Sequence, residues 1–208
     1  GGLAGGNSGT AAVSFWDKGS SGQSGSSGGK GLTTEEMKTV LILQNAGWAN
    51  HAWVMTDGEY PRLSWEGTGG SPIPEPQPVP LSGTGAEMDP YLVGTPEEFA
   101  LLSWRPEVLN AHILLTADVD CTGTLLYPIG DLGAFTGHFE GGGHVINATV
   151  IEQPGSDFVG VFSVVKGGGE VSNLRVDNSV ISGKNNVGGL AGKCDTASIG
   201  TCSCSGQV

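Results

Sequence analysis

Two stretches near the end of the sequence, VGVFSVVKGGGEVSNL at residues 159–174 and VGGLAGKCDTASIGTC at residues 187–202, repeat one pattern of apolar residues. Val187 follows Val159 at an offset of 28 in the numbering, and Ile199 follows Val171 at the same offset. Apolar residues at two separate places in the repeat therefore recur with the same period. A unit this short cannot bury its own apolar face, so successive units are expected to stack on one another.

The repeat predicts an all-β fold, a glycine-rich parallel β-solenoid. Short apolar-alternating runs such as HILLTADVDC, HVINATVI and VSNLRVDNSVI are each bounded by Gly, Asn, Asp or Ser, as in brief strands joined by tight turns. The 37 glycines fit the corners of such coils, where positive φ or close backbone approach is needed. A β-sandwich with glycine-rich hairpins is the alternative, but it leaves the shared offset unexplained.

Composition divides the chain into three regions. Residues 67–85 carry five prolines at alternate positions and are expected to be an extended linker. Residues 1–66 are expected to hold a terminal solenoid coil and a Trp-rich closing module, and residues 86–208 the solenoid domain. A Thr-x-x-Glu capping box predicts a short helix after Thr33 and another after Thr95, both placed as capping helices.

Charge and hydropathy exclude some classes of function. The net charge of -12 leaves no basic patch for nucleic acid. No apolar run approaches the length of a bilayer span, and no signal peptide is recognisable. Because the chain begins abruptly at Gly1, a leader or a larger upstream region is expected to have been removed. No motif calls for a cofactor.

The four cysteines are even in number, and three of them crowd the last part of the chain. They lack the paired C-x-x-C spacing of a zinc site, so we expect one or two disulfides in an exported protein, with the pairing left open. The candidates are Cys121, Cys194, Cys202 and Cys204.

Several motifs resemble the GLUG repeat family of bacterial exported adhesin-like proteins. NNVGGLAGKCDTASIGTCSCSGQV at residues 185–208 resembles the repeat itself, and FTGHFEGGGHVI at residues 135–146 resembles the lead-in to such repeats. The segment LTTEEMKT to LSWE, residues 32–66, resembles the module that closes an array. The resemblance implies a right-handed parallel β-helix at the bacterial cell surface or outside the cell, with a role in adhesion or surface structure.

Carboxylates and histidines offer weak chemical sites. Asp118 and Asp120 would share one face of a strand, where they could bind calcium or act as acid and base, although this pattern also ends strands in the resembled family. His138, Glu140 and His144 form a conceivable metal set, but their spacing is not that of a helical site, and turn packing is favoured. We expect no enzyme activity.

Aromatic residues concentrate in the closing module. Exposed, they could stack on sugars; we favour the interpretation that they plug an apolar solenoid end. They are Trp48, Trp53, Tyr60 and Trp65.

The phrase GGLAG at residues 1–5 recurs at residues 188–192, so the chain begins as its last repeat would continue. We expect the C-terminal coil (187–208) of one subunit to stack on the N-terminal coil (1–17) of the next, which makes a head-to-tail filament. The expected interface residues are Gly1, Gly2, Leu3, Ala4, Val187, Leu190, Ile199 and Val208. Three alternatives remain: a fragment of a longer repeat array, a glycan-binding adhesin and a polysaccharide-degrading enzyme. In a filament the partner is a second copy of the chain. In the adhesin alternative the partners are cell-surface glycans or proteins.

Overall fold

The computed structural model describes residues 2–6, 14–23, 25–46, 48, 52–67, 69–74 and 81–208, apart from the Asn45 side chain. The chain divides into two compact units, Gly1–Pro78 and Val79–Val208. The boundary falls inside the predicted linker, whose two ends are themselves paired. Ser71–Pro72 forms an edge strand of the first unit, and Ser82 bridges to Leu92 in the second.

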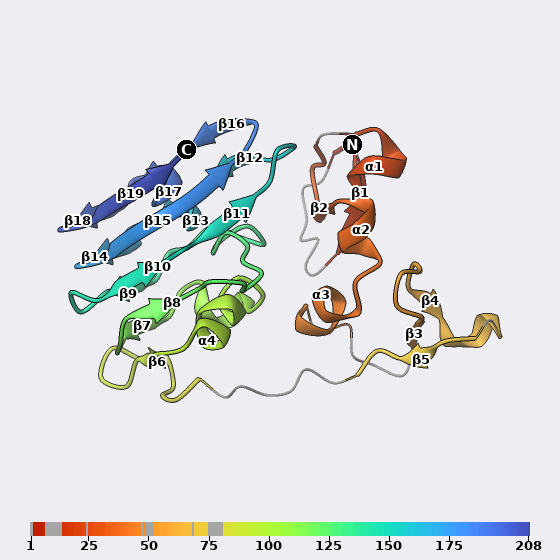
Figure 1. Ribbon diagram of the computed structural model, residues 1–208, viewed down its shortest axis with the longest axis horizontal. Helices are drawn as coiled ribbons and strands as arrows, with labels where there is room; N and C mark the ends of the chain where they lie inside the picture. The colour runs from red at the N-terminus through yellow and green to blue at the C-terminus, as the bar shows by residue number, and fades with distance from the viewer. Residues whose placement is uncertain are drawn as a thin grey trace. The chain divides into compact units, whose positions relative to one another are not determined.

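The first unit contains a parallel strand pair, a small antiparallel sheet and short helices (Figure 1). Its elements are β1 (Phe15–Asp17), α1 (Lys18–Ser21), β2 (Lys30–Leu32), α2 (Thr34–Met37), α3 (Val40–Asn45), β3 (Trp53–Met55), β4 (Arg62–Leu63), η1 (Ser64–Glu66) and β5 (Ser71–Pro72). The capping box at Thr33 is confirmed, because Thr33 Oγ1 accepts from the Glu36 N–H and Glu36 accepts from the Thr33 N–H. The helix it begins ends at Met37, before α3 starts at Val40.

Asp17 ties the first unit together. Its buried carboxylate caps α1 by accepting from the Ser20 N–H at 2.9 Å, and it also accepts from the Thr34 and Tyr60 hydroxyls. Burial raises the pKa of Asp17, but these hydrogen bonds outweigh it and lower the pKa to about 2.

The aromatic residues of the first unit divide between its interior and its surface. Trp48 packs between Phe15 and Trp53, with ring centroids 5.6 Å and 4.6 Å away, and Phe15 is buried. Trp65, in contrast, is 72% exposed. Trp48 and Trp53 are therefore half-buried in one aromatic cluster with Phe15, whereas Trp65 is at the surface.

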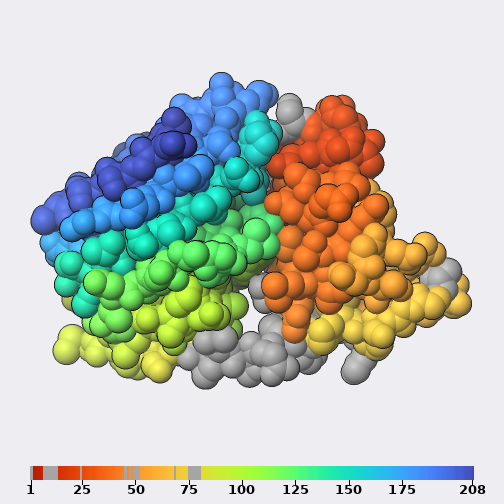
Figure 2. Space-filling model, in the orientation of Figure 1, coloured from red at the N-terminus to blue at the C-terminus, as the bar shows by residue number. Residues whose placement is uncertain are grey.

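The second unit is a parallel β-solenoid of about three turns between residues 112 and 207, as the repeat predicted. Its elements are β6 (Tyr91–Val93), α4 (Pro96–Leu101), η2 (Pro106–Val108), β7 (His112–Leu115), β8 (Val119–Asp120), β9 (His138–Glu140), β10 (Val145–Asn147), β11 (Val150–Glu152), β12 (Asp157–Val159), β13 (Phe162–Lys166), β14 (Glu170–Ser172), β15 (Arg175–Ser182), β16 (Asn185–Val187), β17 (Ala191–Asp195), β18 (Ser198–Gly200) and β19 (Ser203–Gln207). All pairings between these strands are parallel. In Figure 2 the successive turns lie as bands from green through cyan to blue.

The register confirms the predicted period where it was first seen. Val159 pairs with Val187, and Val171 pairs with Ile199. On β13 the offset is one larger, since Phe162 pairs with Ala191 and not with Leu190. One extra residue at the corner before β17 shifts this wall of the solenoid by one position.

Corners of the coils stack as regularly as their strands. Asn173 and Thr201, which stand one period apart, both have a φ of 52°. The Asn173 N–H donates to the carbonyl of Gly200, so these two corners are bonded to each other. Left-handed backbone at a fixed place in each turn is what lets parallel strands turn without breaking register.

One end of the solenoid is closed by helix α4. The capping box predicted at Thr95 is present, with Thr95 Oγ1 accepting from the Glu98 N–H at 3.2 Å. Phe99 of the helix and Leu102 at its C-cap are buried in the same core cluster as Leu115 of β7. This predicted helix therefore does act as a cap.

Candidate assembly interface

The opposite end of the solenoid is formed by β16, β17, β18 and β19, which we call the terminal turn (residues 185–208). Each of these strands pairs with one strand of the turn beneath it and with no other described strand. The outer edge of the terminal turn therefore presents backbone N–H and C=O groups with no described strand beside them. Such edges are the usual sites of strand addition.

The exposed fractions of the side chains in one stacked ladder show how far this end is uncovered. Ile113, Phe139 and Val171 follow one another on the inward face and are 1%, 0% and 0% exposed. Ile199 is the next residue in the ladder, and it is 40% exposed. Its side chain occupies a core position that the described part of the second unit leaves partly uncovered.

The other C-terminal residues predicted for the interface lie on the same turn. Val187 stacks on Val159. Val159 is 1% exposed, whereas Val187 and Leu190 are half-buried. Val208 is 69% exposed. The predicted group thus consists of core-type residues at the uncovered end.

The N-terminal residues predicted for the interface belong to the first unit. Gly1 lies outside the described residues. Leu3 is exposed at 48%, and Ala4 is half-buried. The backbone of Ala4 accepts from the Ser27 N–H at 3.0 Å, so this stretch already runs beside another segment of its own unit.

The two GGLAG phrases share one packing device. A Cβ on Gly2 would lie 2.0 Å from the ring of Trp16, and a Cβ on Gly189 would lie 2.3 Å from Cys204 Sγ. In each phrase the second glycine faces a side chain that follows it by about half a period. Only glycine leaves room for that side chain across the coil.

The prediction of disulfides is not met, because all four cysteines are free. Cys194 pairs in register with Val165, and Cys204 with Val176, both of them fully buried. The cysteines of the terminal turn therefore stand at separate inward positions round the coil, in place of core residues. An even number and a close spacing along the chain could not show this.

Cys121 differs from the other three cysteines. It is 1% exposed in the solenoid core, and burial together with the negative charges of Asp120 and Glu97 raises the pKa of its thiol to about 11. Cys202, by comparison, is half-buried and donates to the Gly200 carbonyl at 3.2 Å.

The carboxylates considered for calcium are already bonded to the protein. Asp118 accepts from the Val145 N–H at 2.9 Å, and this bond and that from His144 lower its pKa. Asp120 accepts from the Thr122 hydroxyl and N–H, which lowers its pKa as well. Within the described residues, no group of three or more His, Cys, Asp or Glu side chains is placed to hold a metal ion.

The histidine and glutamate motif is likewise divided among separate contacts. His138 stacks on His112 at 5.5 Å and faces Glu170, whereas His144 faces Asp118 on the neighbouring coil. Glu140 accepts from the Asn173 side chain at 3.0 Å. These are contacts between successive coils.

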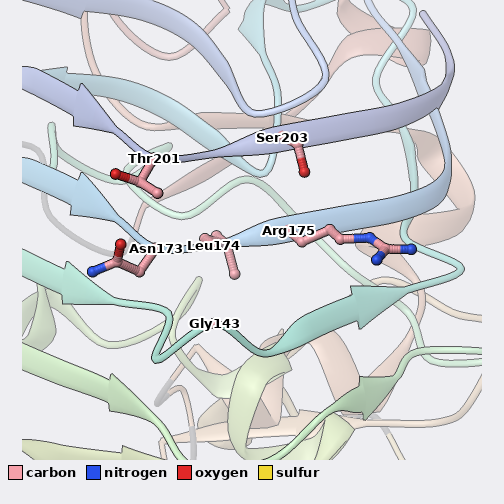
Figure 3. A pocket seen from close by; sticks show the side chains of 6 residues that line it. All are labelled: Gly143, Asn173, Leu174, Arg175, Thr201 and Ser203. Atoms are coloured by element: carbon pink, nitrogen blue, oxygen red, sulfur yellow. The ribbon is translucent and has the colours of Figure 1, made fainter.

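A shallow cavity of about 190 Å³ lies along the corner column of the solenoid (Figure 3). Gly143, Asn173 and Thr201 line it from three successive coils, and Arg175 and Ser203 flank them. Arg175 is already paired with Asp177. The lining repeats from coil to coil, as a corner column should.

Together these features define the second unit as a β-solenoid with one end capped by a helix and one end, called the open end, beside which the structure describes no further strand. Over 120 residues the chain is 31% identical to Halomucin of Haloquadratum walsbyi, a match that covers 53% of this chain and 1% of Halomucin. The similarity is thus distant and partial, and it is to an archaeal protein, not a bacterial one. No family model matches the chain, the GLUG repeat included, and no solved structure matches it. No described helix is long and apolar enough to cross a membrane.

Proposed function

We propose that this chain is a non-enzymatic structural and adhesive protein that assembles head to tail. The terminal turn of one subunit stacks on the N-terminal coil of the next, outside the cell or at its surface. The observation that carries the proposal is Ile199, which is 40% exposed although the residues beneath it in the same ladder are buried.

Stacking of a further coil would both bury the exposed apolar side chains of the open end and pair its free strand edges. A further coil would cover the inward side chains of Val187, Leu190 and Ile199, and it would pair with the outer edges of β16 to β19. Because helix α4 covers the core at the other end of the second unit, the terminal turn is the end that we propose for extension. A contact between two different surfaces joins subunits head to tail, and it gives an open chain when the rotation between subunits does not close into a ring.

The N-terminal coil is the occupant we propose. Its GGLAG phrase repeats that of the terminal turn, and its Gly2 faces Trp16 as Gly189 faces Cys204. Segments that share this packing device can follow one another in a stack, as successive repeats do in solenoids.

A surface location is supported by one distant similarity. About half of the chain is similar to a protein named Halomucin, of which the match covers 1%. The acidic charge of -12 suits a solvated surface structure.

The decisive experiment compares two lysine substitutions on one strand. Ile199→Lys places a charge at the inward position of β18, whereas Ser198→Lys places the same charge on the outward face next to it. Sedimentation velocity over a wide concentration range, with electron micrographs of the same samples, should show filaments for the wild type and for Ser198→Lys, and monomers for Ile199→Lys. A wild type that stays monomeric throughout would overturn the proposal, and so would equal assembly of both variants.

The non-enzymatic part has its own test. Incubation with a panel of acidic and neutral polysaccharides should release no new reducing ends. Release that disappears in Asp118→Asn, with the fold preserved by circular dichroism, would show that the carboxylate pair is catalytic and that the proposal is wrong.

A further inference from the structure

The terminal turn carries three free thiols at its core positions. Cys194 and Cys204 stack on Val165 and Val176, which are fully buried, yet both cysteines are exposed. Cys202 stands one period after Leu174, a residue 1% exposed, and the Ser203 N–H donates to the Leu174 carbonyl. Each thiol therefore stands where the turn below has a buried aliphatic residue.

The two exposed thiols, those of Cys194 and Cys204, make only weak hydrogen bonds. Cys194 Sγ lies 3.5 Å from the Ala197 carbonyl, and Cys204 Sγ lies 3.6 Å from the Ser179 hydroxyl. The backbone of Gly189 packs against the sulfur of Cys204, because a Cβ added at Gly189 would lie 2.3 Å from that sulfur. A group attached to Cys204 must therefore project out of the open end, into the space that a stacked coil would fill.

We infer that the open end is a site for reversible mixed-disulfide formation with small disulfides such as oxidised glutathione, and that occupation of this site blocks stacking. The inference rests on the proposed head-to-tail assembly. Mixed-disulfide formation is the chemistry that would regulate this assembly.

The reaction is a simple exchange. The thiol loses its proton to solvent, and its sulfur attacks one sulfur of the small disulfide. A new S–S bond forms to the protein, the S–S bond of the reagent breaks, and the departing thiolate takes up a proton. The small disulfide is the oxidant, and one equivalent of free small thiol is released.

A mixed disulfide would be incompatible with the stacked state. Parallel strands of successive coils lie about 4.8 Å apart, so a bound coil leaves no room for a peptide-sized adduct at an inward position. Glutathione would also carry charged groups into a plane that stacking makes apolar. Reduced cysteine, in contrast, is a small apolar residue well suited to a covered core.

Cys121 provides an internal control for reactivity. It is 1% exposed, and its thiol pKa of about 11 leaves far less reactive thiolate at neutral pH than an ordinary cysteine has. Treatment of monomeric protein with oxidised glutathione, followed by peptide mass mapping, should label Cys194 and Cys204 at least about tenfold faster than Cys121. Equal labelling of Cys121 in folded protein would overturn the site.

Assembly of the same samples tests the regulatory step. Glutathionylated wild type should fail to form filaments, and dithiothreitol should restore them. In a variant with Cys194→Ala, Cys202→Ala and Cys204→Ala, oxidised glutathione should leave the extent of assembly the same as in the untreated variant, while Cys121→Ala should remain as sensitive as the wild type.

The outcomes separate the two proposals. If untreated protein assembles and the glutathionylated protein assembles equally well, the inference fails and the proposed function stands. If untreated protein does not assemble, the proposed function fails together with the regulatory step. In that case selective labelling of the terminal turn still supports the modification site by itself.

Discussion

Alanine substitutions at the two isoleucines of one ladder test whether the terminal turn is open. Ile113→Ala and Ile199→Ala remove the same three carbons from the same inward face, at a buried position and at the open end. Loss of burial costs about 0.8 kcal/mol per carbon, or about 2.4 kcal/mol for each complete removal. At Ile113 a cavity is added, so the total should be about 3 to 4 kcal/mol.

The cost at Ile199 should be less than half as large. Because its side chain is 40% exposed, only about 60% of the transfer free energy is lost, about 1.4 kcal/mol. The space that the substitution leaves opens to solvent, so no cavity is enclosed. In an assembled filament the same residue would be covered, and the cost should then approach that at Ile113.

Urea unfolding followed by circular dichroism measures both values. With a slope of about 2 kcal/mol/M, Ile113→Ala should lower the midpoint by about 1.5 to 2 M and Ile199→Ala by about 0.7 M in dilute monomer. Equal shifts in protein shown to be monomeric by sedimentation would refute the reasoning, because they would mean that Ile199 is already covered.

Individual contacts give three further predictions. Gly189→Ala should destabilise the solenoid, and adding Cys204→Ala should restore much of the loss, as a double-mutant cycle in urea would reveal; additive losses would contradict the close approach. Asp17 has a lowered folded-state pKa of about 2, so the stability it contributes is complete above its unfolded pKa of about 3.9 and is lost as the pH falls towards 2. Tyr60→Phe should raise that pKa in a carboxyl NMR titration, and an unchanged value would rule out the hydrogen bond as a cause. Thr201→Asn should stabilise the solenoid by up to about 1 kcal/mol in thermal unfolding, since asparagine tolerates the φ of 52° better than a β-branched residue; a loss of stability would contradict this.

Register was predictable from the sequence wherever the path round the coil has constant length. Val159 and Val187 pair as their spacing indicated, and so do Val171 and Ile199. Where corners differ in length the offset changes: the path from His112 to its partner His138 is shorter than the predicted period, and the path from His138 to Glu170 is longer. Such changes depend on how each loop packs, which a single period does not encode.

The candidate sites also differ between the groupings that sequence spacing predicted and the contacts that the folded coils make. Spacing along the chain grouped Asp118 with Asp120, and His138 with His144, but the coils pair each of them with residues about one turn away. Cysteine counting pointed to disulfides, whereas the register assigns the cysteines to inward positions. A coil brings together residues one period apart, so neighbours in sequence are poor guides to neighbours in space.

The sequence by itself determined the architecture, because a short repeated unit with apolar marks has no way to bury them except by stacking. It also determined that a helix begins at Thr95, since the capping box is a local interaction. Only the tertiary structure decided which end is covered and which inward residues, Ile199 and the thiols among them, remain exposed. Exposure depends on whether another coil lies above a residue, and that is a property of the folded stack as a whole.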